Sequence, residues 1–390
     1  MNKKLTIRVG IIQRVIAVYR KPFFEKLARM NDIALSVFSG QSSPYEAIKT
    51  TEKIHLVHLF NTKNHYFSGP LGMICWQQNI IKWLLQFNPD ILVLDANPRI
   101  LSSWVAICKM KLWHRPVLGW GLGSLDRYGF NWQVKIREKI ARFFINKLDG
   151  IIAYSSKAAD DYMKAGFIKN RIFIAYNAID NIESDTYMTK FGSDTRWIDD
   201  WKKKLDLDPT LPIILFVGRL IPQKKVELLI QACIPLFDRC QILIVGDGPI
   251  RPNLEALTEL YKNKVRFIGH QTGKILAKCY IASDVFVLPG AGGLAIHQAM
   301  SYGKPVITSF GDGTESDLVY EGVNGLYFCE SDINGLRDKI REMIMNNEKG
   351  KLMGKASLSI IKEKINIDKM VESYSHALHE MKRISSSNNR

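Results

Sequence analysis

The sequence predicts an α/β protein built from two doubly wound domains that face a central cleft. Short apolar runs recur along the whole chain, and they are continuous rather than alternating. Continuous runs separated by helix-like segments are typical of parallel strands that helices cover on both faces. A polar stretch at 181–208 interrupts the pattern midway, so the runs fall into two sets. In such folds a ligand binds in a cleft at the carboxyl ends of the strands.

The expected elements follow in chain order. In the first set we expect strands at 6–12, 34–38, 54–59, 91–95, 116–120, 150–154 and 172–176, with helices such as 22–30 and 72–87 between them. In the second set we expect strands at 212–217, 241–245, 264–268, 285–288, 305–308 and 325–328. We therefore predict an N-terminal Rossmann-like domain at 1–190 and a C-terminal one at 191–365. The remainder, 366–390, is expected to be a helix that crosses back and ends in a frayed tail.

Length and composition narrow the class of protein. The chain has 390 residues, of which 46% are hydrophobic and 24% charged, as suits a globular protein of two domains. Its six cysteines are scattered, without zinc-site or CxxC spacing, as in a reducing compartment. No apolar run reaches the roughly 18 residues of a membrane span, and the apolar run near the N-terminus is too interrupted for a signal peptide. These features predict a cytoplasmic protein.

The positive charge is unevenly distributed. The net charge is +16. Residues 1–190 hold 27 Lys and Arg against 14 Asp and Glu, a net +13, whereas residues 191–390 hold 27 against 24, a net +3. The first half is therefore expected to meet an anionic partner.

The densest part of this charge lies on a predicted helix at 131–148. Its apolar residues Trp132, Ile136, Ile140, Phe143 and Phe144 are expected on one face, flanked by Lys135, Arg137, Lys139, Arg142 and Lys147. A basic amphipathic helix suits an anionic membrane surface, so we expect a peripheral position on the inner face of the cell membrane. A core helix with a solvated basic face explains the pattern equally well. Nucleic acid is disfavoured, because no recognised binding motif accompanies the charge.

The stretch at 283–308, SDVFVLPGAGGLAIHQAMSYGKPVIT, predicts an anion site. It reads as a buried strand, a loop containing Gly292 and Gly293, a helix that opens near Leu294, and a second strand. Backbone N–H groups at a helix N-terminus bind anions together with the helix dipole, and a nucleotide diphosphate is a frequent occupant. An ordinary strand-to-helix connection would also use glycine.

Three further segments of the second half are expected at the same cleft. The first, FVGRLIPQKKVELLIQA, places Gly218, Arg219 and Lys224 after a strand, where two cations can clamp two phosphate groups. The second, VGDGP, is a tight corner with Gly246 and Asp247. The third is GDGTESD, which precedes YEGVNGLYF.

The order and spacing of these segments resemble the family 4 glycosyltransferases, retaining enzymes of the GT-B fold, and among them the bacterial surface-polysaccharide type. The resemblance spans about residues 5–365 and is carried by GRLIPQKKVELLI, VGDGP, VRFIGH, ASDVFVLPGAGGLAIHQAMSYGKPVIT, EGVNGLYF, VYRKPFFEKL, GWGLGS and IIAYSSKAADDYMKAGF. It implies a nucleotide-sugar donor bound mainly by the C-terminal domain. It implies a saccharide acceptor, in some cases lipid-linked, bound by the N-terminal domain. It also implies sugar transfer with retention, without a metal or other cofactor, in polysaccharide biosynthesis.

The resemblance also assigns roles to single residues. Arg219 and Lys224 would be the catalytic residues, which neutralise the donor diphosphate as it leaves. The donor-binding residues would be Gly218, Gly246, Asp247, Gly292, Gly293, Leu294, Gln298 and Glu315. From their positions in the sequence, rather than from the resemblance, we expect Tyr19, Arg20 and Asp126 to bind the acceptor, although Tyr19 and Arg20 could instead touch the donor or cap the helix that follows them.

The chain departs from the family pattern in its carboxylates. The family usually has one glutamate just after the strand and another eight residues later, and this chain has Gly290 and Gln298 there. Gln298 can still accept a hydrogen bond from a ribose hydroxyl, whereas Gly290 has no side chain. Either other groups such as Glu315 or Asp317 hold the donor sugar, or activity is lost. A histidine frequent near the acceptor is also replaced, by Leu122.

Two other functions stay open from the sequence. A sugar-nucleotide epimerase shares the architecture, but its paired acid and base carboxylates and histidine are not evident. A catalytically silent nucleotide-sugar-binding partner would fit the two missing glutamates. Asp95 and Asp126 could act as a nucleophile, but structural or acceptor-binding roles suit them better. Asp206 and Asp208 resemble a metal-binding pair but lie in the linker, so no metal site is predicted.

Overall fold

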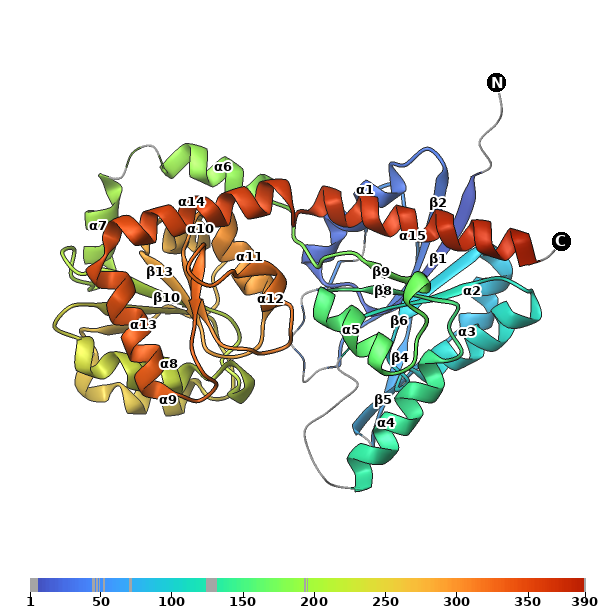
Figure 1. Cartoon of the computed structure of the whole chain (residues 1–390), viewed down its shortest axis with the longest axis horizontal. Coiled ribbons are helices and arrows are strands. Elements are labelled where there is room, and N and C mark those ends of the chain that lie inside the picture. Colours follow the sequence, from blue (N-terminus) through green and yellow to red (C-terminus); the bar gives the residue numbers. More distant parts are fainter. Residues whose placement is uncertain are drawn as a thin grey trace. The chain divides into compact units, whose positions relative to one another are not determined.

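The computed structural model describes residues 6–43, 46, 48, 50–51, 53–69, 72–123, 132–192, 194 and 196–388. The chain divides into two compact units (Figure 1). Unit 1 comprises Met1–Ile179 together with Ile367–Arg390, and unit 2 comprises Asp180–Asn366. Each unit is a parallel sheet covered by helices, so the predicted pair of doubly wound α/β units is confirmed. The cleft between them stays a prediction.

Unit 1 contains a seven-stranded parallel sheet in the order β3-β2-β1-β6-β7-β8-β9. Its strands are β1 (Ile7–Val15), β2 (Ile33–Gly40), β3 (His58–Thr62), β6 (Ile91–Asp95), β7 (Val117–Gly121), β8 (Gly150–Ala153) and β9 (Ile172–Ile174). Its helices are α1 (Lys21–Ala28), α2 (Ile80–Phe87), α3 (Leu101–Leu112), α4 (Trp132–Ile145), α5 (Ser156–Lys164) and α15 (Ile367–Asn388). The strand order reverses between β1 and β6, and ligands of open α/β sheets bind at such a switch point.

Unit 2 contains a six-stranded parallel sheet in the order β12-β11-β10-β13-β14-β15. Its strands are β10 (Ile213–Val217), β11 (Gln241–Val245), β12 (Val265–Phe267), β13 (Val285–Leu288), β14 (Val306–Thr308) and β15 (Gly325–Tyr327). Its helices are α6 (Ile182–Phe191), α7 (Trp197–Lys204), α8 (Val226–Cys233), α9 (Arg251–Leu257), α10 (Gly273–Ala282), α11 (Gly293–Ser301), α12 (Glu315–Leu318), α13 (Ile333–Met345) and α14 (Asn347–Glu363). Here the switch point lies between β10 and β13.

The strands are apolar throughout because helices bury them on both faces. Every residue of β11 and of β13 is buried. A fully buried Val, Leu, Ile or Phe side chain contributes about 1.5–3 kcal/mol of transfer free energy, so these strands form the centre of the core. The polar chemistry is left to the loops at the strand ends, which position the candidate sites.

The C-terminal helix α15 packs on unit 1, although its sequence follows unit 2 (Figure 1). The Tyr374 ring of α15 is fully buried, with its centroid 5.1 Å from the centroids of Phe23 and Trp120. Aromatic pairs of this kind contribute about 0.5–1.5 kcal/mol beyond their burial. Lys26 of α1 also pairs with Asp368 of α15 at 2.6 Å. The helix predicted at 366–390 is therefore a structural part of unit 1.

Two expected elements of unit 1 were wrong. The segment 72–87 is not one helix: β5 (Gly72–Gln77) pairs antiparallel with β4 (Asn64–Gly69), and α2 begins only at Ile80. Short apolar runs do not distinguish a strand from a helix, which explains the error. The strand expected at 54–59 is β3, which begins at His58. Leu56 has a φ of 62°, a value that strands do not adopt.

The boundary between the units lies earlier than expected. In the chain, unit 1 ends at Ile179 and unit 2 begins at Asp180, whereas residue 190 lies inside α6. The stretch that the sequence presents as a polar linker in fact contains α6 and α7. Their polar composition hides them, because strongly apolar periodicity is what identifies a helix in a sequence.

Candidate functional site

The predicted donor-site residues of unit 2 gather at the switch point between β10 and β13. Gly218 directly follows β10, and the loop after β13 ends where α11 begins. The neighbouring corner is close-packed, since a Cβ on Gly246 would lie 1.8 Å from the carbonyl oxygen of Gly218. Glycine is therefore needed at 246 for these two strand ends to approach each other.

Lys224 lies inside the glycine-rich loop. Its ammonium donates a hydrogen bond to the carbonyl oxygen of Ala291. A Cβ on Gly292 would lie 2.3 Å from Lys224 Nζ, and the φ of Gly292, 149°, also favours glycine. Burial lowers the pKa of Lys224, and the nearby carboxylate of Asp312 opposes this shift. A partly desolvated cation at this position is suited to pair with a phosphate group.

The N-terminus of α11 supplies backbone donors beside this cation. Gly293 and Leu294 open the helix, so their N–H groups have no partner within it. A Cβ on Gly293 would lie 2.0 Å from Thr314 Oγ1, which shows that the following loop packs on the helix end. The positive end of the helix dipole adds to the attraction for an anion. We call Lys224, Gly292, Gly293 and Leu294 the anion cradle.

Other predicted donor residues differ in how far they are already engaged. Arg219 is exposed, and within the described part of the chain it has no ion-pair partner. Asp247 pairs with Arg251 at 3.1 Å, so its carboxylate is partly used. On α11, Gln298 accepts a hydrogen bond from the hydroxyl of Tyr280 at 3.4 Å. An amide oxygen can accept twice, so Gln298 keeps one position for a ligand hydroxyl.

Glu315 is engaged by its own loop. It is 3% exposed, and its carboxylate accepts hydrogen bonds from the backbone N–H of Gly311 at 2.8 Å and of Gly313 at 3.0 and 3.1 Å. Burial raises the pKa of Glu315, and these N–H groups oppose the shift. The carboxylate therefore holds the loop in shape, and its contact with a donor sugar stays a prediction.

Gly290, at the position of the missing glutamate, has no room for a side chain. A Cβ there would lie 2.1 Å from the carbonyl oxygen of Gln223 and 2.9 Å from the Cα atom of Lys224. Both are backbone atoms, so no change of rotamer would make space. The loop that carries Lys224 thus occupies the space next to Gly290, a constraint that the sequence does not reveal.

Asp206 and Asp208, whose spacing resembles that of a metal-binding pair, are engaged in local contacts. Asp206 forms an ion pair with Arg266 at 2.5 Å, and Asp208 accepts hydrogen bonds from the backbone and hydroxyl of Thr210 at 2.8 and 2.7 Å. Across the residues that the structure describes, no group of three or more His, Cys, Asp or Glu side chains could hold a metal ion. The predicted independence from a metal stays a prediction.

The predicted acceptor residues of unit 1 differ in exposure. Asp126 lies outside the described residues, and Tyr19 is 46% exposed. Arg20 is only 5% exposed, with its guanidinium carbon 4.9 Å from the ring centroid of Trp120 and 5.3 Å from that of Tyr154. Cation–π contacts of this kind stabilise a buried guanidinium. Arg20 therefore supports the wall formed by these two rings, and a direct contact with an acceptor stays a prediction.

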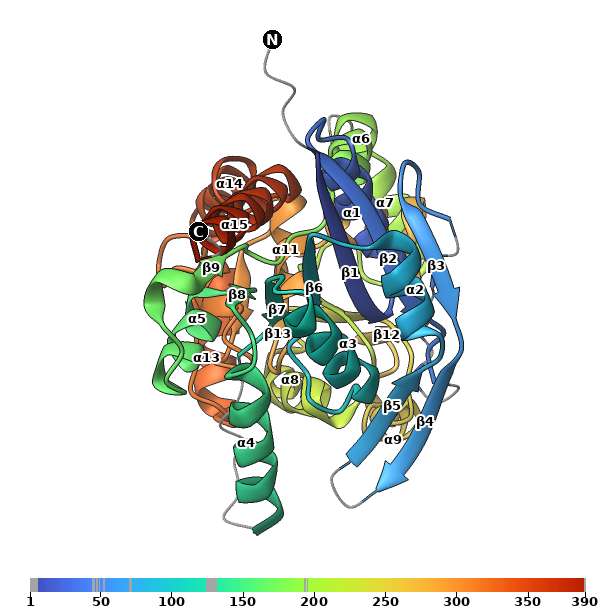
Figure 2. The ribbon, with the colours of Figure 1, turned by 90° about the vertical axis from the view of Figure 1, so that its right-hand side faces the viewer.

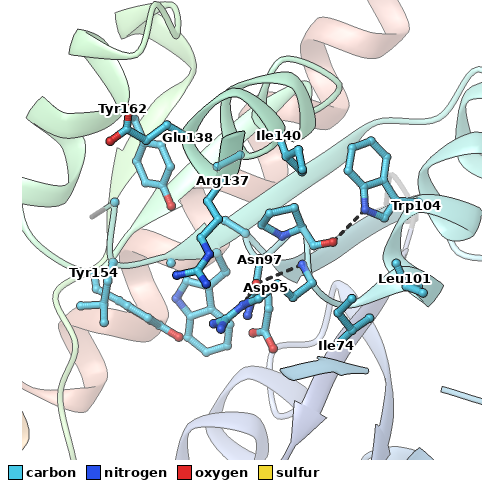
Figure 3. Close-up of a pocket in the computed structure, with 18 of the residues that line it drawn as sticks. Ile74, Asp95, Asn97, Leu101, Trp104, Arg137, Glu138, Ile140, Tyr154 and Tyr162 are labelled. Atoms are coloured by element: carbon cyan, nitrogen blue, oxygen red, sulfur yellow. Dashed lines mark hydrogen bonds between the residues drawn. The ribbon is translucent and has the colours of Figure 1, made fainter. Parts of the chain in front are cut away.

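Trp120 and Tyr154 also line a cavity of about 530 Å³, which the sequence analysis missed. The cavity lies at the carboxyl ends of β6, β7 and β8, and residues of α3, α4 and α5 complete its wall (Figure 3). Asp95 lines it at the end of β6, where it accepts hydrogen bonds from Gln13 Nε2 at 2.5 Å and from the backbone N–H of Arg14 at 3.3 Å. Burial raises the pKa of Asp95. A carboxylate at a strand end beside the switch point was the signal that could have located this cavity.

Helix α4 presents two different faces, so the single apolar face expected from the sequence was wrong. Ile140 lines the cavity and Phe144 is fully buried, whereas Ile136 and Phe143 are 38% and 56% exposed. The exposed side also carries Lys135, Lys139 and Arg142. We call Lys135, Ile136, Lys139, Arg142 and Phe143 the basic face of α4. Figure 2 shows this helix extending from unit 1. Among the described helices, none is long and apolar enough to span a bilayer.

Two protein-family models match this chain. The model described as "Glycosyl transferases group 1" matches residues 198–359, within unit 2. The model described as "Glycosyltransferase Family 4" matches residues 24–181, almost all in unit 1. Together they cover both compact units, and neither one alone covers half of the chain.

Curated relatives match at modest identity. A sulfoquinovosyl transferase of Arabidopsis thaliana is 27% identical over 307 residues, which are 75% of this chain and 57% of the relative. A GDP-mannose-dependent alpha-mannosyltransferase of Corynebacterium glutamicum is 28% identical over 295 residues, 72% of this chain and 65% of that protein. The matches thus span somewhat more than half the length of these relatives.

Solved structures share the fold over nearly the whole chain. HepE of Anabaena, in complex with UDP and glucose, superposes with a TM-score of 0.69 at 16% identity, covering 96% of this chain and 99% of that one. Sucrose-phosphate synthase of Thermosynechococcus elongatus gives 0.71 at 18% identity, with 96% and 99% covered. Such identities establish the fold alone, and the predicted GT-B fold is confirmed. Each compact unit thus matches a glycosyltransferase family model, and the chain has the fold of these solved glycosyltransferase structures.

Proposed function

We propose that this chain transfers a sugar from a nucleotide-sugar donor to a saccharide or lipid-linked saccharide acceptor. The observation that carries the proposal is the anion cradle, in which Lys224 lies within the glycine loop at the N-terminus of α11. A cation beside helix N–H groups at a switch point suits the diphosphate of a nucleotide sugar. The names of the relatives support this choice, since one is a sulfoquinovosyl transferase and one a GDP-mannose-dependent mannosyltransferase.

The proposed chemistry follows from the charges that form during transfer. When the bond between the anomeric carbon and the diphosphate oxygen breaks, negative charge grows on the diphosphate and positive charge on the sugar. Arg219, Lys224 and the first N–H groups of α11 would stabilise the diphosphate, which is usually the largest catalytic contribution.

The proposed stereochemical course is retention. The acceptor oxygen bonds to the anomeric carbon on the face that the diphosphate leaves, and the acceptor proton passes to a diphosphate oxygen. The departing group thus acts as the base, so the step needs neither a protein nucleophile nor a metal ion. In this proposal the side chains of Arg219 and Lys224 supply the positive charge that a metal ion would otherwise provide.

The proposed setting is the cytoplasm, at the periphery of the inner face of the membrane, in cell-surface polysaccharide biosynthesis. The basic face of α4 supports this setting, because exposed Ile136 and Phe143 stand beside three cations. Apolar side chains that enter the headgroup region and cations that meet anionic lipids act together in peripheral binding.

The test is a panel of UDP-, GDP- and dTDP-sugars incubated with the full chain. Slow hydrolysis of one donor, or transfer to an added acceptor, supports the proposal. Conversion of the sugar without an acceptor would indicate an epimerase instead. If no nucleotide sugar and no nucleoside diphosphate binds, the proposed donor site is wrong.

One observation favours a second candidate, a catalytically silent nucleotide-sugar-binding partner. The backbone of Gln223 closes the space at Gly290, so the carboxylate that the family places there cannot be restored by a side chain at this position. Tight binding of a donor with neither hydrolysis nor transfer, over the whole panel, would favour this candidate.

A further inference from the structure

We propose that the cavity of unit 1 binds an amphiphilic acceptor, with its hydroxyl-bearing end near Asp95 and its hydrocarbon chain near Leu101 and Trp104. This inference rests on the proposed function, because it names the class of acceptor that the transferase would use. It goes further by placing the hydrocarbon part inside the protein rather than in the bilayer.

The cavity has a polar and an apolar end. Asp95, Asn97 and Arg137 line it on one side (Figure 3). On the other side Leu101, Trp104 and Ile74 lie together. A free saccharide exposes hydroxyl groups in every direction, and apolar walls would leave part of them without hydrogen-bond partners. A molecule with one polar and one apolar end matches both walls.

The polar end is fixed at the switch point of the sheet. Asp95 ends β6, and its carboxylate is held by the side chain of Gln13 at 2.5 Å and the backbone of Arg14 at 3.3 Å, both on the neighbouring strand β1. A carboxylate offers about four acceptor positions, so Asp95 keeps capacity for a ligand hydroxyl. The reacting hydroxyl of an acceptor would therefore be oriented at this end.

The apolar end continues to the protein surface. Leu101 lines the cavity and is also 42% exposed, which places it at the rim. The Trp104 ring stacks on the ring of Phe143, with centroids 5.9 Å apart, and Phe143 is 56% exposed on the basic face of α4. An apolar path thus leads from the cavity to a surface suited to anionic lipid. A lipid-linked molecule drawn from a membrane fits this path, whereas a small soluble acceptor does not need it.

The test is a calorimetric titration of the full chain with n-alkyl β-glucosides from hexyl to decyl, each below its micelle concentration. Burying one methylene tightens binding by about fourfold, so two methylenes should tighten it by roughly fifteenfold until the cavity is full. Glucose and phenyl glucoside serve as the free-saccharide and soluble-aromatic ligands. If glucose binds as tightly as the long-chain glucosides, or if phenyl glucoside binds more tightly than all of them, the proposal is overturned.

A pair of variants on one helix localises the chain. Leu101→Asp places a charge at the apolar end and should weaken octyl glucoside binding at least tenfold. Leu112→Asp changes the same residue type on the same helix, at a side chain that is 75% exposed and does not line the cavity, and should alter binding less than twofold. Equal effects of the two variants contradict the proposal. Both positions are exposed, and thermal melting checks that both variants fold.

The same protein samples separate this proposal from the proposed function. Titration with UDP and GDP reports on unit 2 alone. If a nucleotide binds but the alkyl series is flat, only the cavity proposal fails. If no nucleotide binds, the donor site fails, and the alkyl series still decides whether the cavity takes a hydrocarbon chain.

Discussion

Units 1 and 2 share a fold class, but their charge differs completely. Unit 1 holds 30 Lys and Arg against 14 Asp and Glu, a net charge of +16, whereas unit 2 holds 24 of each, a net charge of zero. The candidate sites differ as well. The anion cradle of unit 2 is built from glycines, backbone N–H groups and one lysine, and the cavity of unit 1 is built from aromatic, aliphatic and charged side chains. The anion cradle therefore depends mainly on backbone geometry and one cation, whereas the cavity depends on side chains.

The largest loss of activity is expected when either of the two proposed catalytic cations of unit 2 is removed. Arg219→Ala and Lys224→Ala should each remove about 2–4 kcal/mol of transition-state stabilisation, by analogy with the loss of one oxyanion donor. The measurement is kcat/KM on a productive donor. Lys225→Gln is the matched control, because Lys225 is adjacent but pairs with Glu330 at 2.5 Å. Near wild-type turnover in both alanine variants would show that Arg219 and Lys224 are not the catalytic cations.

The charge of unit 1 should decide membrane binding. The protein should sediment with phosphatidylglycerol vesicles at low salt, and Lys135→Glu with Lys139→Glu and Arg142→Glu should abolish this. Each cation near an anionic surface contributes about 1 kcal/mol and is screened within roughly 8–10 Å at physiological salt.

A charge reversal of the same size in unit 2 serves as the control for membrane binding. Lys203→Glu with Lys204→Glu and Lys262→Glu makes the same change in net charge on exposed positions of the neutral unit. Sedimentation should then persist. Equal losses in both triple variants would mean that net charge, rather than the basic face of α4, governs binding.

Filling Gly290 should damage unit 2 rather than repair it. Gly290→Glu and Gly290→Ala both place a Cβ 2.1 Å from the carbonyl oxygen of Gln223, so the lysine loop must move. We expect about 1–3 kcal/mol of destabilisation, the usual cost of overpacking, and weaker nucleotide binding. Thermal melting and calorimetry measure the two effects. Gly350→Ala, in helix α14 with ordinary contact distances, should leave both unchanged or slightly improved. A gain of activity in Gly290→Glu would refute the steric argument.

Acid should destabilise unit 2 through His297. This side chain is fully buried on α11, and burial lowers its pKa to about 4. The unfolded chain takes up a proton below its ordinary pKa of about 6.5, whereas the folded protein does not until about 4. Stability should therefore fall by up to about 1.4 kcal/mol per pH unit as the pH drops through this window. Denaturant melts of the parent and of His297→Gln at pH 7 and pH 5 measure it, and an equal fall in both would exclude His297 as the cause.

The smallest effect is expected at Gln298. Loss of one neutral hydrogen bond costs about 0.5–1.5 kcal/mol, so Gln298→Ala should weaken nucleotide affinity by roughly threefold to tenfold. Tyr280→Phe removes the hydroxyl that Gln298 accepts from at 3.4 Å and should change affinity less. If Gln298→Ala abolishes nucleotide binding, or leaves the affinity unchanged, Gln298 does not contact the ribose.

The sequence predicted most of what the backbone enforces. Continuous apolar strands such as β11 and β13 are visible because burial on both faces requires them. The candidate donor site can be recognised for a similar reason, since Gly246 and Gly292 lie where a Cβ would collide with neighbouring atoms. A steric requirement for glycine leaves a mark that spacing can reveal.

The cavity of unit 1 has no comparable pattern in the sequence. Trp104, Trp120 and Arg137 come from three separate elements, and each residue type is equally at home in a core or on a surface. Only their assembly at the strand ends forms the cavity. The faces of α4 were mistaken for a related reason, because Phe143 and Phe144 are adjacent in sequence, yet one is exposed and the other buried.

The place of α15 has a consequence for how the chain folds during synthesis. Unit 2 lies between the two segments of unit 1, so a ribosome releases all of unit 2 before it releases Tyr374. Until then Tyr374 cannot make its contacts with the rings of Phe23 and Trp120. All residues of unit 2 are therefore available for folding before unit 1 has received its last helix. Unit 1, whose synthesis begins first, is therefore completed only after all of unit 2 has been made.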